Sequence, residues 1–127
     1  FLLWNGLAQY VLDHGIEILF GVASFHGTDI EALKLPLSWL HHHHLAPPAL
    51  RVRSRHLQAM DLVPAADLDR RAAMVAMPAL IKAYLRLGAQ VCGAPCWDPE
   101  FGVADVFILL KREDLCPRYA RHFKAAV

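Results

Sequence analysis

The chain lacks the features that define several large protein classes. It has no run of about 18 apolar residues, the length at which a helix spans a bilayer, so no membrane-spanning segment is predicted. Its 13 basic and 12 acidic residues leave a net charge of +1 with histidine neutral, which gives no strong attraction to nucleic acid. Its three cysteines are an odd number, which favours reduced thiols in a cytoplasmic protein over a disulfide framework.

The chain is instead rich in apolar residues. They make up 56% of its 127 residues and charged residues 20%, so it can bury a core and is not disordered. It opens without a methionine, inside a pattern typical of an amphipathic helix. The high apolar fraction suits a piece whose missing part covers some of its surface. We therefore expect residues 1–127 to form a single partial domain, the C-terminal portion of a larger one.

The first third of the chain predicts a helix, a strand and a second helix. Residues 1–14 place apolar side chains at helical spacing. The side chains of residues 16–25 would alternate between the two faces of a strand, and none after residue 17 is charged. This pattern predicts a strand covered on both sides. The pair Thr28 and Glu31 matches a capping box with Thr28 as the N-cap, and Pro36 should kink or restart the helix that follows.

The last third predicts a helix, a hairpin and a short helix. Residues 78–87 form the helix, which ends at Gly88. Residues 90–97 and 103–111 form the two strands of the hairpin, and Pro117 opens the last helix. Because helices alternate with strands, the predicted fold is α/β or α+β, with a mixed sheet flanked by helices.

Four consecutive histidines, 41–44, occupy the end of the second helix. His41 and His44 would share a face at a spacing that suits a metal pair, but no third ligand and no HExxH signature accompany them. The alternative is a polar helix end whose side chains suit the unsatisfied carbonyl groups. The second interpretation is preferred, so no metal site is expected.

Asp105 is the one charge in the otherwise apolar run VADVFILL, residues 103–110 of the predicted strand. An unpaired carboxylate would be costly there, so it needs a partner, and Lys82, Tyr84 and Arg86 of the preceding helix are candidates. A carboxylate held in a sheet can also act as a general base if burial raises its pKa. Asp105 is therefore the candidate catalytic residue.

Two more carboxylates lie in the hairpin connection. Asp98 precedes Pro99, a common way to open a turn, so a structural role is the simpler reading. The functional alternative is that Asp98 and Glu100 bind ammonium groups of a substrate.

Basic residues are concentrated at Arg51, Arg53 and Arg55. They form either a solvated surface or a docking site for an acidic carrier protein or anionic lipid.

Two long segments resemble a known family. They are LLWNGLAQYVLDHGIEILFGVASFHGTD with LSWLHHHHLAPPALRVRS, and MPALIKAYLRLGAQVCGAPCWDPEFGVADVFILLKREDLCPRYARHF. Together they resemble the L-ornithine Nα-acyltransferases of bacterial ornithine-lipid synthesis, sometimes labelled hemolysin-like, within the GNAT acyltransferase superfamily. The most specific elements are YLRLGA, DPxF and PRYARHF, at 84–89, 98–101 and 117–123.

The resemblance implies a GNAT-like fold whose N-terminal strands and basic, glycine-containing carrier loop precede this chain. It implies transfer of a 3-hydroxyacyl chain from acyl carrier protein to the α-amino group of L-ornithine, which makes lyso-ornithine lipid. The thioester donor needs no metal or redox cofactor. We expect Asp105 to be catalytic, Asp98 and Glu100 to bind ornithine, and Tyr84 and Arg86 to support them.

The expected location is the cytoplasm, with or without peripheral contact with the anionic inner membrane. Two alternatives belong to other classes. One is a non-catalytic module that binds a membrane or a partner, and the other is a metal-binding protein that uses the histidine run.

Overall fold

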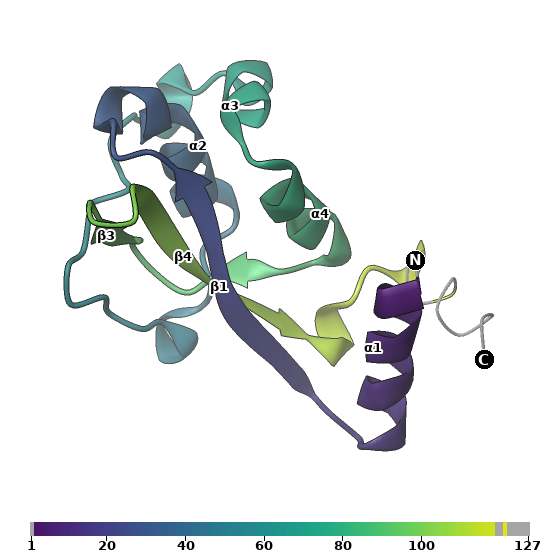
Figure 1. The fold of residues 1–127 in the computed structure, drawn as a ribbon. Coiled ribbons are helices and arrows are strands. Elements are labelled where there is room, and N and C mark those ends of the chain that lie inside the picture. Colours follow the sequence, from purple (N-terminus) through teal and green to yellow (C-terminus); the bar gives the residue numbers. More distant parts are fainter. Residues whose placement is uncertain (1, 119–120, 122–127) are drawn as a thin grey trace.

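A computed structural model describes residues 2–118 and 121 (Figure 1). The described residues form four α-helices and a four-stranded antiparallel sheet, which confirms the mixed fold class. The helices are α1 (Leu2–Asp13), α2 (Ile30–His43), α3 (Arg70–Ala76) and α4 (Ala79–Leu87); the strands are β1 (Ile18–His26), β2 (Gln90–Val91), β3 (Cys96–Asp98) and β4 (Val103–Lys111).

Strand β4 lies at the centre of the sheet. Strand β1 pairs with it along nine residues, from Ile18 opposite Lys111 to His26 opposite Val103. Strands β2 and β3 follow one another along the other side of β4. The predicted hairpin is confirmed, but its first strand, expected over 90–97, is interrupted. Four residues, 92–95, stand opposite two residues of β4, so the strand bulges between β2 and β3.

One face of the sheet is covered by helices, and α2, α3 and α4 lie together on that side (Figure 1). Because side chains alternate along a strand, β4 sends its even-numbered residues to this core, where Ala104 and Val106 are fully buried. Strand β1 contributes Phe25, which is 1% exposed. The core thus lies between the sheet and helices α2 and α4.

The other face of the sheet is open along β1, whereas Leu109 of β4 is buried there with Ala46 and Cys92. Phe20 and Val22 of β1 point to it and are 71% and 64% exposed. The expectation that this strand is covered on both sides is therefore wrong for the part of the chain that the structure describes. The pattern misled because uncharged side chains on both faces do not distinguish a buried face from an exposed apolar one.

Helix α2 begins one residue later than the capping box predicted. Asp29 is the N-cap, and its carboxylate accepts a hydrogen bond from the backbone N–H of Glu31 at 3.1 Å. The helix continues through Pro36, so it does not restart there. Pro36 is fully buried, and burial of its ring offsets part of the hydrogen bond that a proline cannot make.

Helix α4 ends as predicted at Gly88, which has a left-handed φ of 106°. A Cβ at this position would lie 2.4 Å from the backbone oxygen of Asp114. The segment after β4 packs here, and the N–H of Cys116 donates to the carbonyl of Leu87 at 2.9 Å. Gly88 thus joins the end of α4 to the chain beyond β4.

We expect Gly88→Ala to lower the free energy of unfolding by about 2–3 kcal/mol, since it adds left-handed strain and a clash with a carbonyl oxygen. Gly15→Ala is the matched control: Gly15 also has a positive φ, 59°, but nothing lies within 4 Å of its missing Cβ. The control should lose only about 1–2 kcal/mol from strain. Urea unfolding measures both, and equal losses would show that the contact with Asp114 is not tight.

Candidate functional site

The candidate site lies on the open face of the sheet, around the carboxylate of Asp105. In the central strand β4, Asp105 stands opposite Ser24 of β1 on one side and Cys96 of β3 on the other. The hydroxyl of Ser24 donates a hydrogen bond to Oδ1 of Asp105 at 2.5 Å. The carboxylate of Asp105 is therefore held in place by a neutral partner from the neighbouring strand.

The expectation that the preceding helix supplies the partner of Asp105 is wrong. Helix α4 covers the opposite face of the sheet, where Tyr84 packs against the main core and meets the ring of Trp4 edge-on at 6.0 Å. Arg86 is exposed on the same helix. Residues 82–86 were close to Asp105 only in the sequence. The sheet separates these helical residues from Asp105, and the register of β1 with β4 places Ser24 beside Asp105 instead.

Apolar side chains surround the Ser24–Asp105 pair. The rings of Phe20 and Phe107 stack at 5.6 Å, and Val22 stands directly opposite Phe107 in the neighbouring strand. Exposed apolar surface of this kind is typical of a binding face. A carboxylate with one fixed hydrogen bond in such surroundings can hold an ammonium group or accept a proton.

Asp98 lies on the same face of the sheet as Asp105. It stands opposite Val103, two residues along β3 from Cys96, which places it diagonal to Asp105 at about 7–8 Å between Cα atoms. Oδ1 of Asp98 accepts a hydrogen bond from the N–H of Phe101 at 3.1 Å, so the structural role in the turn is confirmed. Among the described residues, no hydrogen bond reaches its second oxygen, and the Asp98 side chain is half-buried.

Glu100 is exposed at the tip of the same hairpin. Together with Asp98 it lines a shallow hollow, whose other walls come from β3 and from residues 56–58. The hollow places both predicted ornithine-binding carboxylates at one end of the open face.

An apolar cavity of about 390 Å³ lies between α1 and the sheet, near the end of β4. This volume is within the usual range for small-molecule sites. Its walls are mostly aliphatic and aromatic, and include Trp4, Leu7, Val11, Leu19, Leu110 and Leu115. Glu17 and Arg112 are the charged residues that line it. The cavity can take an apolar chain but offers few groups for a polar ligand. No sequence pattern predicted this cavity, because its walls come from segments far apart in the chain.

Cys92, Cys96 and Cys116 are free in the structure. Cys92 is completely buried, and burial raises the pKa of its thiol, so it remains protonated and unreactive.

The basic residues Arg51, Arg53 and Arg55 are all exposed. The guanidinium Nε of Arg51 also donates a hydrogen bond to the carbonyl of Ala46 at 2.7 Å.

The histidine pair considered from the sequence, His41 with His44, does not form. His44 is the C-cap of α2, and its N–H donates to the carbonyl of Leu40 at 2.9 Å. Burial, and then the neighbouring His43, lower the pKa of the His44 imidazole. His41 and His42 instead meet Asp61, a residue that the sequence did not single out.

Two other sequence features have simple outcomes. Of the PRYARHF element, Pro117 and Arg118 are helical, and most of the remainder lies outside the described residues. Within the described ranges, no helix combines the length and hydropathy needed to cross a bilayer.

Comparison with known proteins gives one consistent answer. The chain is 56% identical to an L-ornithine N(alpha)-acyltransferase of Rhodobacter capsulatus over 126 residues, which is 99% of this chain and 49% of that protein. Proteins of the same name from Brucella abortus and Rhizobium meliloti are 42% and 38% identical, over 98% of this chain and 45% and 43% of their own lengths. No family model and no solved structure matches, so the GNAT-like fold stays a prediction.

The chain therefore spans about half the length of the curated relatives it matches. Identities of this size over nearly all of its residues confirm the resemblance seen in the two long segments. The chain is homologous to L-ornithine N(alpha)-acyltransferases and corresponds to about half the length of each of these proteins.

Proposed function

We propose that the protein containing this chain is an N-acyltransferase that moves a 3-hydroxyacyl chain from acyl carrier protein to the α-amino group of L-ornithine. The product is lyso-ornithine lipid. The observation that carries the proposal is the 38–56% identity, over nearly the whole chain, to proteins named for ornithine acylation. The carrier protein and the hydroxyacyl donor follow from the family resemblance.

The reaction is the attack of an amine on a thioester. The α-ammonium group must lose a proton before its nitrogen can form the new N–C bond. The C–S bond then breaks, and the leaving thiolate takes up the second proton that the nitrogen gives up, so that the carrier departs as a thiol. A carboxylate in hydrogen-bonding reach can orient the ammonium and take this proton. Asp105 suits the role because Ser24 fixes one oxygen and the apolar surroundings strengthen its attraction to a cation.

A second carboxylate on the same face supports a substrate with two amino groups. Ornithine carries an α-ammonium and a side-chain ammonium. Asp98, diagonal to Asp105, and Glu100, at the hairpin tip, lie where they can hold the second of these groups.

A chimaera tests this function. The matching 126 residues of the Rhodobacter capsulatus relative are replaced by this chain, and the purified protein is incubated with hydroxyacyl carrier protein and ornithine. We expect a carrier-dependent acyl-ornithine product by mass spectrometry. If the chimaera is folded but makes no product while the unaltered relative does, the catalytic proposal fails.

The alternative, a module that binds membranes or a partner without catalysis, has a different signature. It would associate with anionic lipid vesicles, lose this association as salt is raised, and give no acyl-ornithine.

A further inference from the structure

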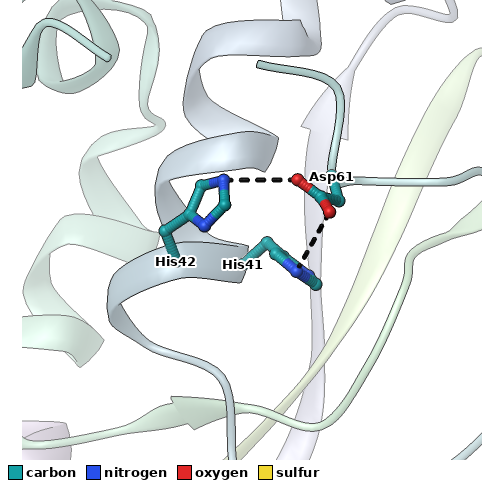
Figure 2. Close-up of side chains that lie close together, drawn as sticks. All are labelled: His41, His42 and Asp61. Carbon is teal, nitrogen blue, oxygen red and sulfur yellow. Dashed lines mark ion pairs between the residues drawn. The ribbon is translucent and has the colours of Figure 1, made fainter. Parts of the chain in front are cut away.

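At the end of α2, two adjacent histidines converge on one carboxylate (Figure 2). The Nε2 atom of His42 lies 3.2 Å from Oδ1 of Asp61, and the Nε2 atom of His41 lies 3.6 Å from Oδ2 of Asp61. The two histidines belong to the helix, whereas Asp61 belongs to an irregular segment that runs beside it. Two imidazole nitrogens and a carboxylate are a ligand set that zinc uses in proteins.

The distances in this cluster suit a small cation. Bonds of about 2.0–2.2 Å around a tetrahedral zinc ion place neighbouring ligand atoms about 3.3–3.6 Å apart. The two measured N···O distances are close to this range, and one ligand atom from each residue lies within 4.8 Å of the others. Small side-chain rotations would bring all three residues onto one ion.

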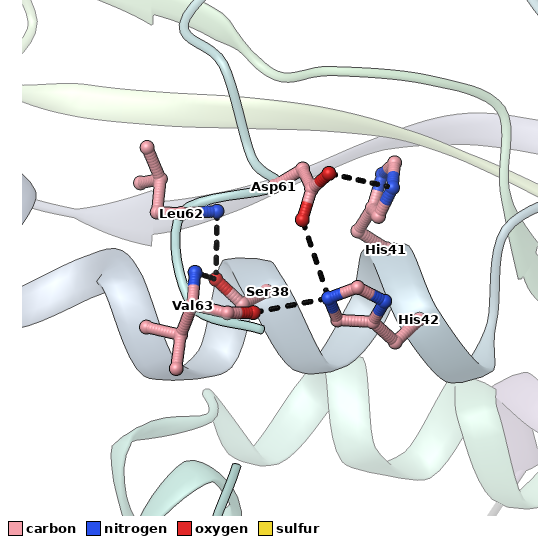
Figure 3. Close-up of polar contacts among 6 residues, drawn as sticks. All are labelled: Ser38, His41, His42, Asp61, Leu62 and Val63. Carbon is pink, nitrogen blue, oxygen red and sulfur yellow. Dashed lines mark hydrogen bonds and ion pairs between the residues drawn. The ribbon is translucent and has the colours of Figure 1, made fainter. Parts of the chain in front are cut away.

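The backbone beside Asp61 is anchored to the same helix. Ser38 of α2 is fully buried, and its Oγ accepts hydrogen bonds from the N–H groups of Leu62 at 3.1 Å and Val63 at 2.9 Å (Figure 3). Nε2 of His42 also lies 3.0 Å from the carbonyl oxygen of Val63, a contact that this nitrogen gives up when it binds an ion. The three ligands are therefore brought together by the fold itself, which lowers the cost of ordering them around an ion.

The cluster is also accessible. The side chains of His41 and His42 are 31% and 21% exposed, and that of Asp61 is 60% exposed. An ion could enter from solvent, and water could complete its coordination. The competing explanation is that the imidazoles and the carboxylate only form hydrogen bonds or ion pairs with one another. The zinc titration described below distinguishes this explanation from metal binding.

We propose that His41, His42 and Asp61 form a binding site for a divalent cation of the zinc type, which ties the segment around Asp61 to α2. The proposal departs from the sequence-based expectation of no metal. It also differs from simple affinity of a histidine run, since it uses two of the four histidines and requires a carboxylate from a distant part of the chain.

Zinc titration of the tag-free chain by calorimetry, after removal of metal with a chelator, tests the site. We expect one zinc ion per chain. We expect at least a tenfold loss of zinc affinity for each of Asp61→Asn, His41→Gln and His42→Gln. Changing residues that only hydrogen-bond to metal ligands already costs about 10–100-fold in affinity, so removing a ligand should cost no less. His43→Gln and His44→Gln are the matched controls and should bind as the parent does.

Three results would overturn the proposal: no zinc binding, unchanged binding by Asp61→Asn, or equal weakening by all four histidine changes. The last would mean that the run binds metal without the fold. Folding is checked by thermal unfolding in chelator. Asp61→Asn changes an exposed, isosteric side chain and should unfold near the parent temperature there. Added zinc should raise the unfolding temperature of the parent but not of Asp61→Asn.

Discussion

Replacing Asp105 by asparagine should lower the rate of acyl transfer by the chimaera about 10²–10⁴-fold, the usual contribution of a general base. The amide keeps the size of the carboxylate and can still accept a hydrogen bond from Ser24, but it can neither take a proton nor attract an ammonium group. The loss should appear mainly in kcat, measured from the initial rate of acyl-ornithine formation at saturating donor and acceptor.

Two further variants give this experiment its resolution. Asp67→Asn removes an exposed carboxylate that lies between α2 and α3, outside the strands of the sheet, and should leave the rate unchanged. Ser24→Ala frees the carboxylate of Asp105 without removing it, so we expect a smaller loss of rate than Asp105→Asn causes. A rate within twofold of the parent for Asp105→Asn would remove this residue from the mechanism.

Truncating Phe25 to alanine should lower the free energy of unfolding by about 3–5 kcal/mol, the usual cost of removing a buried aromatic ring. Phe25 is 1% exposed and belongs to the core between the sheet and α2. A loss of this size is a large part of the stability of a typical domain. Urea unfolding should show a lower midpoint with an unchanged slope.

Phe20 provides a control within the same strand. It is 71% exposed on the other face, where its main aromatic contact is the stacked ring of Phe107. Phe20→Ala should therefore cost less than about 1.5 kcal/mol. Similar losses for the two variants would contradict the assignment of a covered and an open face to the sheet.

Local patterns predicted the elements well because each depends on residues close in the sequence. Helical spacing found α1, the left-handed Gly88 set the end of α4, and the β-branched run gave the bounds of β4. The same reasoning placed Asp105 in the second strand of the hairpin, and the structure puts that strand at the centre of the sheet. The capping signal at Thr28 was shifted by one residue because Asp29 is an equally good N-cap.

The site contacts could not be predicted in this way. The bond between Ser24 and Asp105 joins residues 81 positions apart, and only the strand register reveals it. Asp61 lies in a segment with no periodic pattern, so its approach to His41 and His42 depends on how that segment packs against α2. Periodicity tells which residues share a face of an element, but it does not tell which elements face one another.

The position of β1 at the border of the sheet has a consequence for the solution behaviour of this chain. Within the described residues, the side of β1 turned away from β4 offers a row of backbone donors and acceptors, and the exposed Phe20 and Val22 lie beside it. Such a border is a template on which another polypeptide can add a strand. Light scattering over a range of protein concentrations therefore belongs with every titration described above, because self-association through β1 would alter apparent stoichiometries and unfolding midpoints.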